Sequence, residues 1–354
     1  MSSAQPMHSY KLAQFGEPLR EVIESPPVPT GTQVLLRVRA CGVCHSDIHI
    51  SEGYFNLGRG QKTELSRAVQ LPRILGHEIV GVVDELGPEA SGVGVGARRV
   101  IYPWGGCGKC PPCQIGQENL CARPANLGVH RDGGFTNYIL VEHPKYLIEF
   151  DPLPETFAAT LACSGLTAFS ALKKAAPVDA LNPLLIIGAG GLGLAAINLS
   201  LALYGVGPVV ADIDASKRKA ALDAGASSAV DPADPDIRQR LMKETGGFSA
   251  AIDFVGAESA TGFGLALLRK GGRIYVVGLF GGSMEIPLAT LPLRAVGVVG
   301  SFVGSLPELR ELLALARDGR VKSMPIESRP LDAAQQSLDD LRAGRVRGRV
   351  VLTP

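Results

Sequence analysis

The chain has 354 residues, and at about 150 residues per domain this length predicts two domains. Lysine and arginine (35) nearly balance aspartate and glutamate (34), and 19% of the residues are charged, which argues against a nucleic-acid-binding polycation or an acidic tail. Glycine accounts for 43 residues and hydrophobic side chains for 46%, a composition typical of tightly packed α/β proteins.

Seven cysteines cannot all pair within the chain, and the first thirty residues contain no apolar stretch of the kind found in export signals. Glycine, proline or charge interrupts every apolar run before it reaches the roughly 18 residues of a membrane span. We therefore expect a soluble protein in a reducing cytoplasm, with neither a membrane nor a nucleic acid as its partner.

The first region, residues 1–160, alternates short β-rich runs such as 33–39 with turns rich in glycine and proline. It holds six of the seven cysteines. This texture predicts a mostly β domain with long loops.

The second region, residues 165–303, repeats a strand followed by a helix. The expected strands are 184–187, 209–211, 228–230, 250–255, 273–277 and 295–299, and the expected helices are 192–203, 217–224, 237–244 and a segment around 265–268. Six strands separated by helices predict a parallel, doubly wound sheet.

The third region has expected helices near 307–318 and 331–343 and a closing strand at 346–352. A closing strand with no neighbours of its own needs a sheet to join. We therefore expect this region to fold back onto the first.

A glycine-rich segment at residues 188–193 fits the pattern G-x-G-x-x-G between an expected strand and an expected helix. The first glycine allows the tight turn, the second lets the backbone approach a pyrophosphate, and the last lets the helix pack closely on the strand. The alternative is a glycine-rich turn in a nucleotide-free α/β domain. The predicted phosphate-binding residues are Gly188, Gly190, Gly191, Leu192 and Gly193.

Asp212 ends the next strand, 19 residues after Gly193, which is close to the ~20 expected for a carboxylate that binds the ribose hydroxyls. Its charge would repel a 2′-phosphate, so NAD is favoured over NADP. Lys217 is close enough in sequence to reach the same ribose. Alternatively, Lys217, Arg218 and Lys219 form the solvated start of a helix.

Four cysteines with the spacing C-x2-C-x2-C-x7-C predict a closed tetrahedral zinc site, which leaves no open position for a substrate and is therefore structural. An iron–sulfur cluster is a rival, although ferredoxin runs continue with x3-C-P. Disulfides are a third reading and conflict with a reducing compartment. The four residues are Cys107, Cys110, Cys113 and Cys121.

A second, more widely spaced set consists of Cys44, His77 and Cys163. Each residue alone is more often part of a core than a ligand. Together they match a catalytic zinc site, which needs three protein ligands and one free position, and for which two cysteines and a histidine are a known set.

The sequence closely resembles the zinc-dependent medium-chain alcohol dehydrogenases along essentially its whole length. The motifs that carry the resemblance are Cys-Gly-Val-Cys-His-Ser-Asp at 41–47, Gly-His-Glu at 76–78, the four-cysteine lobe, Cys163 in LACSGLTAFSAL, the glycine segment and Asp212. The resemblance implies an α/β fold with a mostly β, GroES-like catalytic domain and a Rossmann NAD-binding domain. The implied ranges are 1–164 for the catalytic domain, with a structural zinc lobe at 104–124, 165–303 for the Rossmann domain, and 304–354 for the return to the catalytic domain.

The resemblance also implies roles around the metal. Cys44, His77 and Cys163 would bind the catalytic zinc. Glu78 would lie nearby or act as a transient ligand, and Asp47 would orient the zinc-bound histidine.

For proton transfer, the resemblance implies that Ser46 accepts the substrate proton and His49 passes it to solvent. His45 and Arg349 would contact the cofactor pyrophosphate, and Trp104 would form a wall of the substrate pocket. His49 and Trp104 could instead be ordinary loop residues.

The implied function is reversible hydride transfer between a primary or secondary alcohol and NAD, with two zinc ions per chain and a homo-oligomer in which a tetramer is favoured over a dimer. The alternatives are an NADP-linked aromatic, cinnamyl-type enzyme and a polyol dehydrogenase of the same superfamily. Polyol members usually carry glutamate at the third zinc position, so Cys163 favours simple alcohols. A non-enzymatic zinc module that contacts nucleic acid would use Arg342, Arg345, Arg347 and Arg349.

One departure from the family pattern is the long segment 50–75. Its residues Tyr54, Phe55 and Leu57 would either close over the substrate or pack in a subunit interface.

Overall fold

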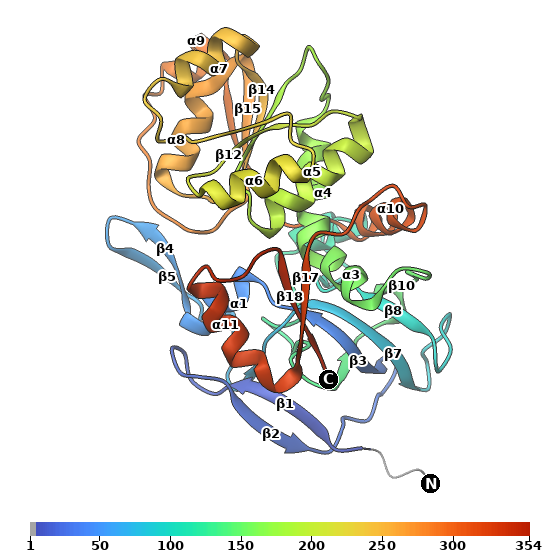
Figure 1. The fold of residues 1–354 in the computed structure, drawn as a ribbon. Coiled ribbons are helices and arrows are strands. Elements are labelled where there is room, and N and C mark those ends of the chain that lie inside the picture. The colour runs from blue at the N-terminus through green and yellow to red at the C-terminus, as the bar shows by residue number, and fades with distance from the viewer. Residues whose placement is uncertain (1–4) are drawn as a thin grey trace. The chain divides into compact units, whose positions relative to one another are not determined.

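The computed structural model describes residues 5–354, so residues 1–4 of the expected first domain lie outside the described part. The chain divides into two compact units (Figure 1). Unit 1 contains the chain up to Tyr54 together with Glu64–Leu166 and Gly304–Pro354, and unit 2 contains Phe55–Thr63 and Thr167–Val303.

Unit 1 is built on a sheet with the strand order β10-β8-β7-β3-β18-β17, in which β9 also pairs with β3. The order of a second, smaller sheet is β2-β1-β6. Along β3 the burial alternates, with Leu36 and Val38 inside and Arg37 and Arg39 in solvent, as the two-residue period of a strand requires. The strands are β1 (Met7–Leu12), β2 (Arg20–Glu24), β3 (Val34–Gly42), β6 (Arg73–Ile74), β7 (Glu78–Leu86), β8 (Arg98–Ile101), β9 (Tyr138–Val141), β10 (Leu147–Ile148), β17 (Ile326–Pro330) and β18 (Arg349–Thr353).

The closing strand β18 pairs antiparallel with β3, with Leu352 opposite Cys41, and parallel with β17. The closing strand of the third region thus joins the sheet of the first region. The strand begins at Arg349, three residues later than expected, because the glycine at 348 has a φ of +77° and turns the chain into the sheet.

The helices of unit 1 are short, and some of them are capped by side chains. At the start of α10, for example, Glu308 accepts from the backbone of Ser305 and Ser305 accepts from the backbone of Glu308, which forms a capping box. The helical elements are α1 (His45–Glu52), α2 (Pro111–Gln114), η1 (Glu118–Leu120), η2 (Pro144–Tyr146), α3 (Glu155–Thr160), η3 (Leu161–Gly165), α10 (Leu306–Arg317), η4 (Leu331–Ala333) and α11 (Ala334–Arg342). Among them, η3 is a turn of π-helix.

Unit 2 is a parallel sheet with the order β13-β12-β11-β14-β15-β16, and helices flank it (Figure 1). This is the doubly wound order 3-2-1-4-5-6, so the predicted fold class is confirmed. The strands are β11 (Leu184–Ile187), β12 (Val209–Ala211), β13 (Ser228–Val230), β14 (Phe248–Asp253), β15 (Leu268–Val276) and β16 (Gly297–Gly300). The helices are α4 (Leu166–Ala175, continuing from unit 1), α5 (Gly191–Tyr204), α6 (Ala215–Asp223), α7 (Ile237–Thr245), α8 (Glu258–Leu267) and α9 (Thr290–Arg294).

Several boundaries differ from the expectation by a few residues, among them the starts of β15 and β16. Leu268 begins β15 and does not belong to the preceding helix, which starts earlier than expected, at Glu258. Ala295 has a φ of +49° and ends α9, a helix that the sequence analysis did not predict, so β16 starts at Gly297. In both places the aliphatic residues suit a strand and a helix equally well, and tertiary packing decides between them.

The hairpin formed by β4 (Tyr54–Gly58) and β5 (Gln61–Glu64) lies in the segment that departs from the family pattern. Its tip, 55–63, belongs to unit 2, whereas the expected boundaries place it in the first domain. A Cβ on Gly281 would lie 2.1 Å from the carbonyl oxygen of Asn56, and Arg59 forms an ion pair with Glu285 at 2.5 Å. The tip is therefore packed closely against the loop that follows β15.

Within residues 5–354, every helix is too short or too polar to cross a lipid bilayer.

Candidate active site and metal centres

The four cysteines of the lobe come together in unit 1, with all four sulfur atoms within 4.8 Å of one another. All are free thiols, and the Sγ atoms of Cys110 and Cys113 are 3.4 Å apart, too far for a disulfide bond of about 2.05 Å. Zinc–sulfur bonds of about 2.3 Å in a tetrahedron place the sulfurs about 3.8 Å apart. The lobe therefore fits a tetrahedral zinc ion.

Backbone amides prepare this lobe for charged sulfur. The N–H groups of Lys109 and Cys110 lower the pKa of Cys107 to about 6, and Cys121 Sγ accepts from the N–H groups of Cys107 and Arg123 at 3.2 and 3.3 Å. Burial instead raises the pKa of Cys113 to about 12. A bound cation would allow all four cysteines to be thiolates at once.

Glu118, which no sequence pattern singled out, anchors the lobe. Its carboxylate accepts from the backbone N–H of Gly106 at 3.1 Å, from Lys145 Nζ at 2.8 Å and from the hydroxyl of Tyr146 at 2.5 Å. The available signal was a single acidic residue inside the seven-residue gap before Cys121.

The second set of ligands also meets in unit 1. The ligand atoms of Cys44, His77 and Cys163 lie within 4.8 Å of one another, and all three residues are buried. Cys44 caps α1, His77 directly precedes β7, and Cys163 lies in the π-turn η3, a local distortion often found at functional sites.

The imidazole of His77 supports a metal at this place. Its Nε2 is buried and has no hydrogen-bond partner among residues 5–354. An unpaired buried nitrogen is costly, and a metal ion would satisfy it. Two cysteines and one histidine leave one position of a tetrahedral zinc ion open, so the residues fit a catalytic zinc.

Asp47 ties two of these ligand segments together. Its Oδ2 accepts from the backbone N–H of Cys44 at 2.9 Å, and its Oδ1 accepts from the backbone N–H of Gly76 at 3.1 Å. The same Oδ1 lies 3.3 Å from His77 Nδ1. Asp47 therefore connects the segments that carry the two predicted ligands, in addition to its expected contact with the histidine.

Glu78 and Arg349 form a buried ion pair next to the ligands. Arg349 also donates from Nη1 to the carbonyl oxygen of Val43 and from Nε to Ser164 Oγ, both at 3.3 Å, and only 3% of the residue is exposed. Burial raises the pKa of Glu78 to about 7, although Arg349 acts in the opposite direction. The expected pyrophosphate contact of Arg349 stays a prediction, while the structure shows all its guanidinium nitrogens engaged inside unit 1.

The thiols of Cys44 and Cys163 share a hydrogen bond that shifts their pKa values in opposite directions. This bond lowers the pKa of Cys44 well below its usual range, against the effect of burial, and raises the pKa of Cys163. Arg349 further favours the charged form of Cys44.

The expected relay residues lie on α1. Ser46 Oγ is 3.8 Å from Cys44 Sγ, and His49 is half-buried one turn further on. Burial lowers the pKa of His49. His45 is exposed at the first position of the helix.

Trp104 is buried, and its ring lies 5.2 Å from that of His77 between centroids, tilted by 55°. It therefore packs directly beside a predicted metal ligand. This position agrees with the expected pocket wall, whose role stays a prediction.

In unit 2 the glycine segment forms the expected turn between β11 and α5. Gly188 has a φ of +92°, and a Cβ on Gly193 would lie 1.9 Å from the carbonyl oxygen of Gly188. A Cβ on Gly190, by contrast, would meet nothing within 4 Å. The protein itself does not need glycine at 190, but a phosphate that approaches the backbone does, so the turn fits a dinucleotide.

Asp212, which directly follows β12, links that strand end to the turn. Its Oδ2 accepts from the N–H of Ala189 at 2.8 Å and its Oδ1 from the N–H of Asp214 at 2.9 Å. Gly191 and Leu192 form the start of α5, and Lys217 is exposed in the first turn of α6.

A residue of unit 2 that the sequence analysis missed is Asp253, fully buried at the end of β14. Its Oδ1 accepts from the backbone N–H groups of Val255 and Gly256, both at 2.9 Å, and its Oδ2 accepts from the Thr261 hydroxyl at 2.6 Å. The loop that it holds packs against the glycine turn, because a Cβ on Gly188 would lie 2.8 Å from Val255 Cγ2. The signal was an aspartate at a strand end, followed by glycine.

The arginines named for the non-enzymatic alternative are mostly engaged. Arg342 pairs with Glu52 and Asp339, and Arg345 pairs with Asp340. Since Arg349 is buried as well, these arginines do not form a free basic face.

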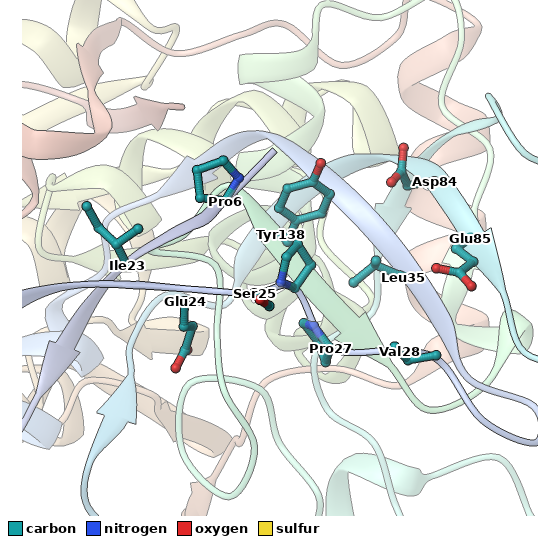
Figure 2. A pocket seen from close by; sticks show the side chains of 11 residues that line it. Pro6, Ile23, Glu24, Ser25, Pro27, Val28, Leu35, Asp84, Glu85 and Tyr138 are labelled. Atoms are coloured by element: carbon teal, nitrogen blue, oxygen red, sulfur yellow. The ribbon is translucent and has the colours of Figure 1, made fainter. Parts of the chain in front are cut away.

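A surface pocket of about 520 Å³ lies elsewhere on unit 1 (Figure 2). Its lining combines apolar side chains such as Ile23, Val28 and Tyr138 with the carboxylates of Asp84 and Glu85. None of the predicted metal ligands or relay residues lines it, so it is not part of the candidate site.

A doubly wound sheet with a dinucleotide turn, a closed sulfur site and an open Cys₂His site define a zinc-dependent oxidoreductase. Residues 30–152 match the alcohol dehydrogenase GroES-like domain family, and residues 191–318 match the zinc-binding dehydrogenase family. An NAD-dependent alcohol dehydrogenase of Sulfurisphaera tokodaii is 36% identical over 98% of this chain and 100% of its own length. The chain therefore belongs to the zinc-dependent medium-chain alcohol dehydrogenase family.

Two further relatives show the range of this family. The crystal structure of the alcohol dehydrogenase from Aeropyrum pernix has a TM-score of 0.86 and 30% identity, and the comparison covers 98% of this chain and 100% of that one. A D-arabinose 1-dehydrogenase (NADP(+)) of Saccharolobus solfataricus is 32% identical over 97% of this chain and 96% of its own length.

Proposed function

We propose that this protein oxidises a primary or secondary alcohol to an aldehyde or ketone with NAD, and that it catalyses the reverse reduction. The observation that carries the proposal is the buried set of Cys44, His77 and Cys163, in which His77 Nε2 lacks a partner within the described residues. The identity to an NAD-dependent alcohol dehydrogenase supports this choice of substrate class and cofactor.

Zinc held by these three residues would supply a Lewis acid for the alcohol oxygen, and bound NAD would supply the hydride acceptor. The protein keeps the ligands in place through Asp47, which fixes both Cys44 and His77. Trp104 packs against the imidazole ring of His77.

The proton of the alcohol leaves through side chains of α1 in this proposal. The Ser46 hydroxyl accepts it, and His49 passes it to solvent. Because burial lowers the pKa of His49 from its usual value near 6.5, its imidazole is neutral at pH 7 and can accept a proton.

The dinucleotide would bind at the glycine turn, where the open space at Gly190 admits a phosphate and Asp212 is close to the ribose hydroxyls. Lys217, His45 and Arg349 remain proposed contacts. The lobe of four cysteines would hold a second, structural zinc ion, which gives two per chain.

We further propose a cytoplasmic homo-oligomer, with a tetramer favoured over a dimer. The edge strand β16 has a neighbour on one side within the described residues. Large apolar side chains are exposed on and near it, and a second copy would bury them. They are Phe280 (68%), Leu288 (78%), Leu293 (74%), Val298 (41%) and Phe302 (48%).

The test is the initial rate of NAD and, separately, NADP reduction with linear, branched, aromatic and polyol alcohols, with and without prior removal of metal by a chelator. We expect chelator-sensitive turnover with NAD that returns on addition of zinc. Absence of turnover with every alcohol in a sample with two zinc ions per chain would refute the proposal.

A second candidate is an NADP-linked dehydrogenase for aromatic alcohols or for polyols and sugars. The similarity to an NADP-dependent D-arabinose 1-dehydrogenase favours the sugar branch. The same panel distinguishes it, because this candidate predicts a higher kcat/KM with NADP and a polyhydroxylated or aromatic substrate.

A further inference from the structure

Arg218 lies near the start of α6, but its side chain does not extend into solvent. From α6 its side chain turns back to the ends of two strands, and its Nη1 donates to the carbonyl oxygens of Asp212 at 2.8 Å and Ile213 at 2.9 Å. The same nitrogen lies 3.0 Å from Asp231 Oδ2. The side chain is 21% exposed, whereas Lys217 and Lys219 on either side of it are exposed.

The register of the sheet explains this arrangement. Strands β12 and β13 run parallel with Ala211 opposite Val230, so Asp212 and Asp231 follow at neighbouring strand ends. The guanidinium of Arg218 spans these two ends. It is therefore held next to the residue whose carboxylate is the proposed ribose contact.

A guanidinium next to the proposed ribose contact is suited to bind a phosphate. Its planar, forked N–H groups match the oxygens of a phosphate, and arginine commonly binds the 2′-phosphate of NADP near this strand end. In this chain the group already has acceptors: one carboxylate and two carbonyl oxygens.

Resting on the proposed dinucleotide site, we propose that Asp231 is a positioning residue for cofactor specificity. Asp231 holds Arg218 against the backbone at 212–213 and neutralises it, so that the guanidinium is not available to a 2′-phosphate. Selectivity for NAD then has two coupled parts: Asp212 repels the 2′-phosphate, and Asp231 retains the cation that would attract it.

The test compares the binding of two cofactor fragments, 5′-AMP and adenosine 2′,5′-bisphosphate, by calorimetry with the zinc-loaded enzyme. These ligands differ in the 2′-phosphate alone. The variants are Asp212→Ser, Asp231→Asn and the double variant. We expect the wild type to prefer 5′-AMP, and the double variant to shift the affinity ratio toward the bisphosphate beyond the product of the single shifts. The expected excess is about tenfold, or 1.4 kcal/mol.

Three further variants separate the specific effect from general charge or stability effects. Asp231→Glu keeps the ion pair and should retain the wild-type ratio. Arg218→Met in the double variant should abolish the gain. Asp223→Asn removes the same charge from the exposed Lys219–Asp223 pair of α6 and should leave the ratio unchanged.

Additive single effects, or an equal shift in Asp223→Asn, would show that net charge alone sets the ratio and would overturn the proposal. Failure of the proposed function has a different signature, because the wild type would then bind neither fragment. The kcat/KM ratio for NADP and NAD provides a second readout in the same variants.

Discussion

The lobe at residues 107–121 collects four sulfur ligands from one short loop, whereas the second site collects three ligands from residues 44, 77 and 163. Two lobe cysteines are partly exposed, but all residues of the second site are buried. Four ligands from a local loop would close the coordination sphere of a metal ion and crosslink the chain. Three ligands from distant segments meet only in the folded domain and would leave one position open for chemistry.

The polar groups around the two sites show the same contrast between local and distant partners. The lobe uses backbone N–H groups and the Glu118 anchor, which are local. Around the second site, Asp47, Glu78 and Arg349 are buried polar groups from three segments: Asp47 accepts from the backbone of Cys44, Arg349 Nη2 lies 4.0 Å from Cys44 Sγ, and Glu78 pairs with Arg349. Such networks are expensive to bury, so we expect them where function requires them.

The largest effect should come from His77→Ala. A Lewis acid lowers the activation free energy by several kcal/mol, and each ~1.36 kcal/mol corresponds to a factor of ten in rate. Its loss therefore predicts a fall in kcat/KM of roughly 10³-fold or more. Binding of 5′-AMP should persist, because the glycine turn lies in unit 2. If the His77→Ala variant kept a rate near that of the wild type, the second site would not be catalytic, and the contrast between the two sites would no longer hold.

His49→Gln should have the next largest effect on activity, a fall of roughly 10²-fold in alcohol oxidation. Since the pKa of His49 is lowered, the wild-type rate should decline only as the pH falls below about 6.5, where the protonated imidazole can no longer accept a proton. The variant should lack this limb of the pH–rate profile. An identical profile in the variant would exclude His49 from the relay.

Cys110→Ser should instead act on stability. We expect the zinc content to fall from two ions per chain to one, and Tm to fall by roughly 10 °C, because metal binding contributes folding free energy. Cys41→Ala is the matched control, since Cys41 is a buried thiol outside both sites and its loss should leave two zinc ions. If Cys110→Ser instead lost all turnover but kept its melting curve, the lobe would have the catalytic role and not the structural one.

Glu118→Gln should give the smallest change, a destabilisation of about 1–3 kcal/mol with both zinc ions retained. Although burial opposes it, hydrogen bonding to Lys145 and Tyr146 lowers the pKa of Glu118. The stabilisation is therefore present above the unfolded pKa near 4.3 and is lost as the pH falls through the lower folded value. Urea unfolding at pH 7 and pH 3 checks this, and an equal effect at both values would argue against the anchoring role.

Sequence patterns predicted the local parts of the molecule well. The lobe was readable because its four ligands are neighbours in the chain, and the glycine turn because it must join a strand to a helix. Strands such as β11 and β12 were found within a residue or two, since short aliphatic runs between turn signals have few alternatives. In the expected helical segment around 265–268, the last residue, Leu268, belongs to β15, because aliphatic residues suit both a helix and a strand.

Side-chain roles that depend on distant neighbours were not accessible in this way. Among the three consecutive basic residues at 217–219, the guanidinium of Arg218 packs onto two strand ends, whereas Lys217 and Lys219 are exposed. No spacing rule predicts this difference. The hairpin tip at 55–63 joined unit 2 although its neighbours in sequence belong to unit 1.

The sequence by itself determined the fold class and predicted the two sulfur-containing sites and the dinucleotide turn, because each prediction follows from residue types at short or characteristic spacing. Only the tertiary structure decided that Asp47 joins two ligand segments, that Arg349 pairs with Glu78, and that Asp231 retains Arg218. The physical reason is that hydrogen bonds and ion pairs require separations of about 3 Å, and only the packing of the folded chain brings such distant residues that close.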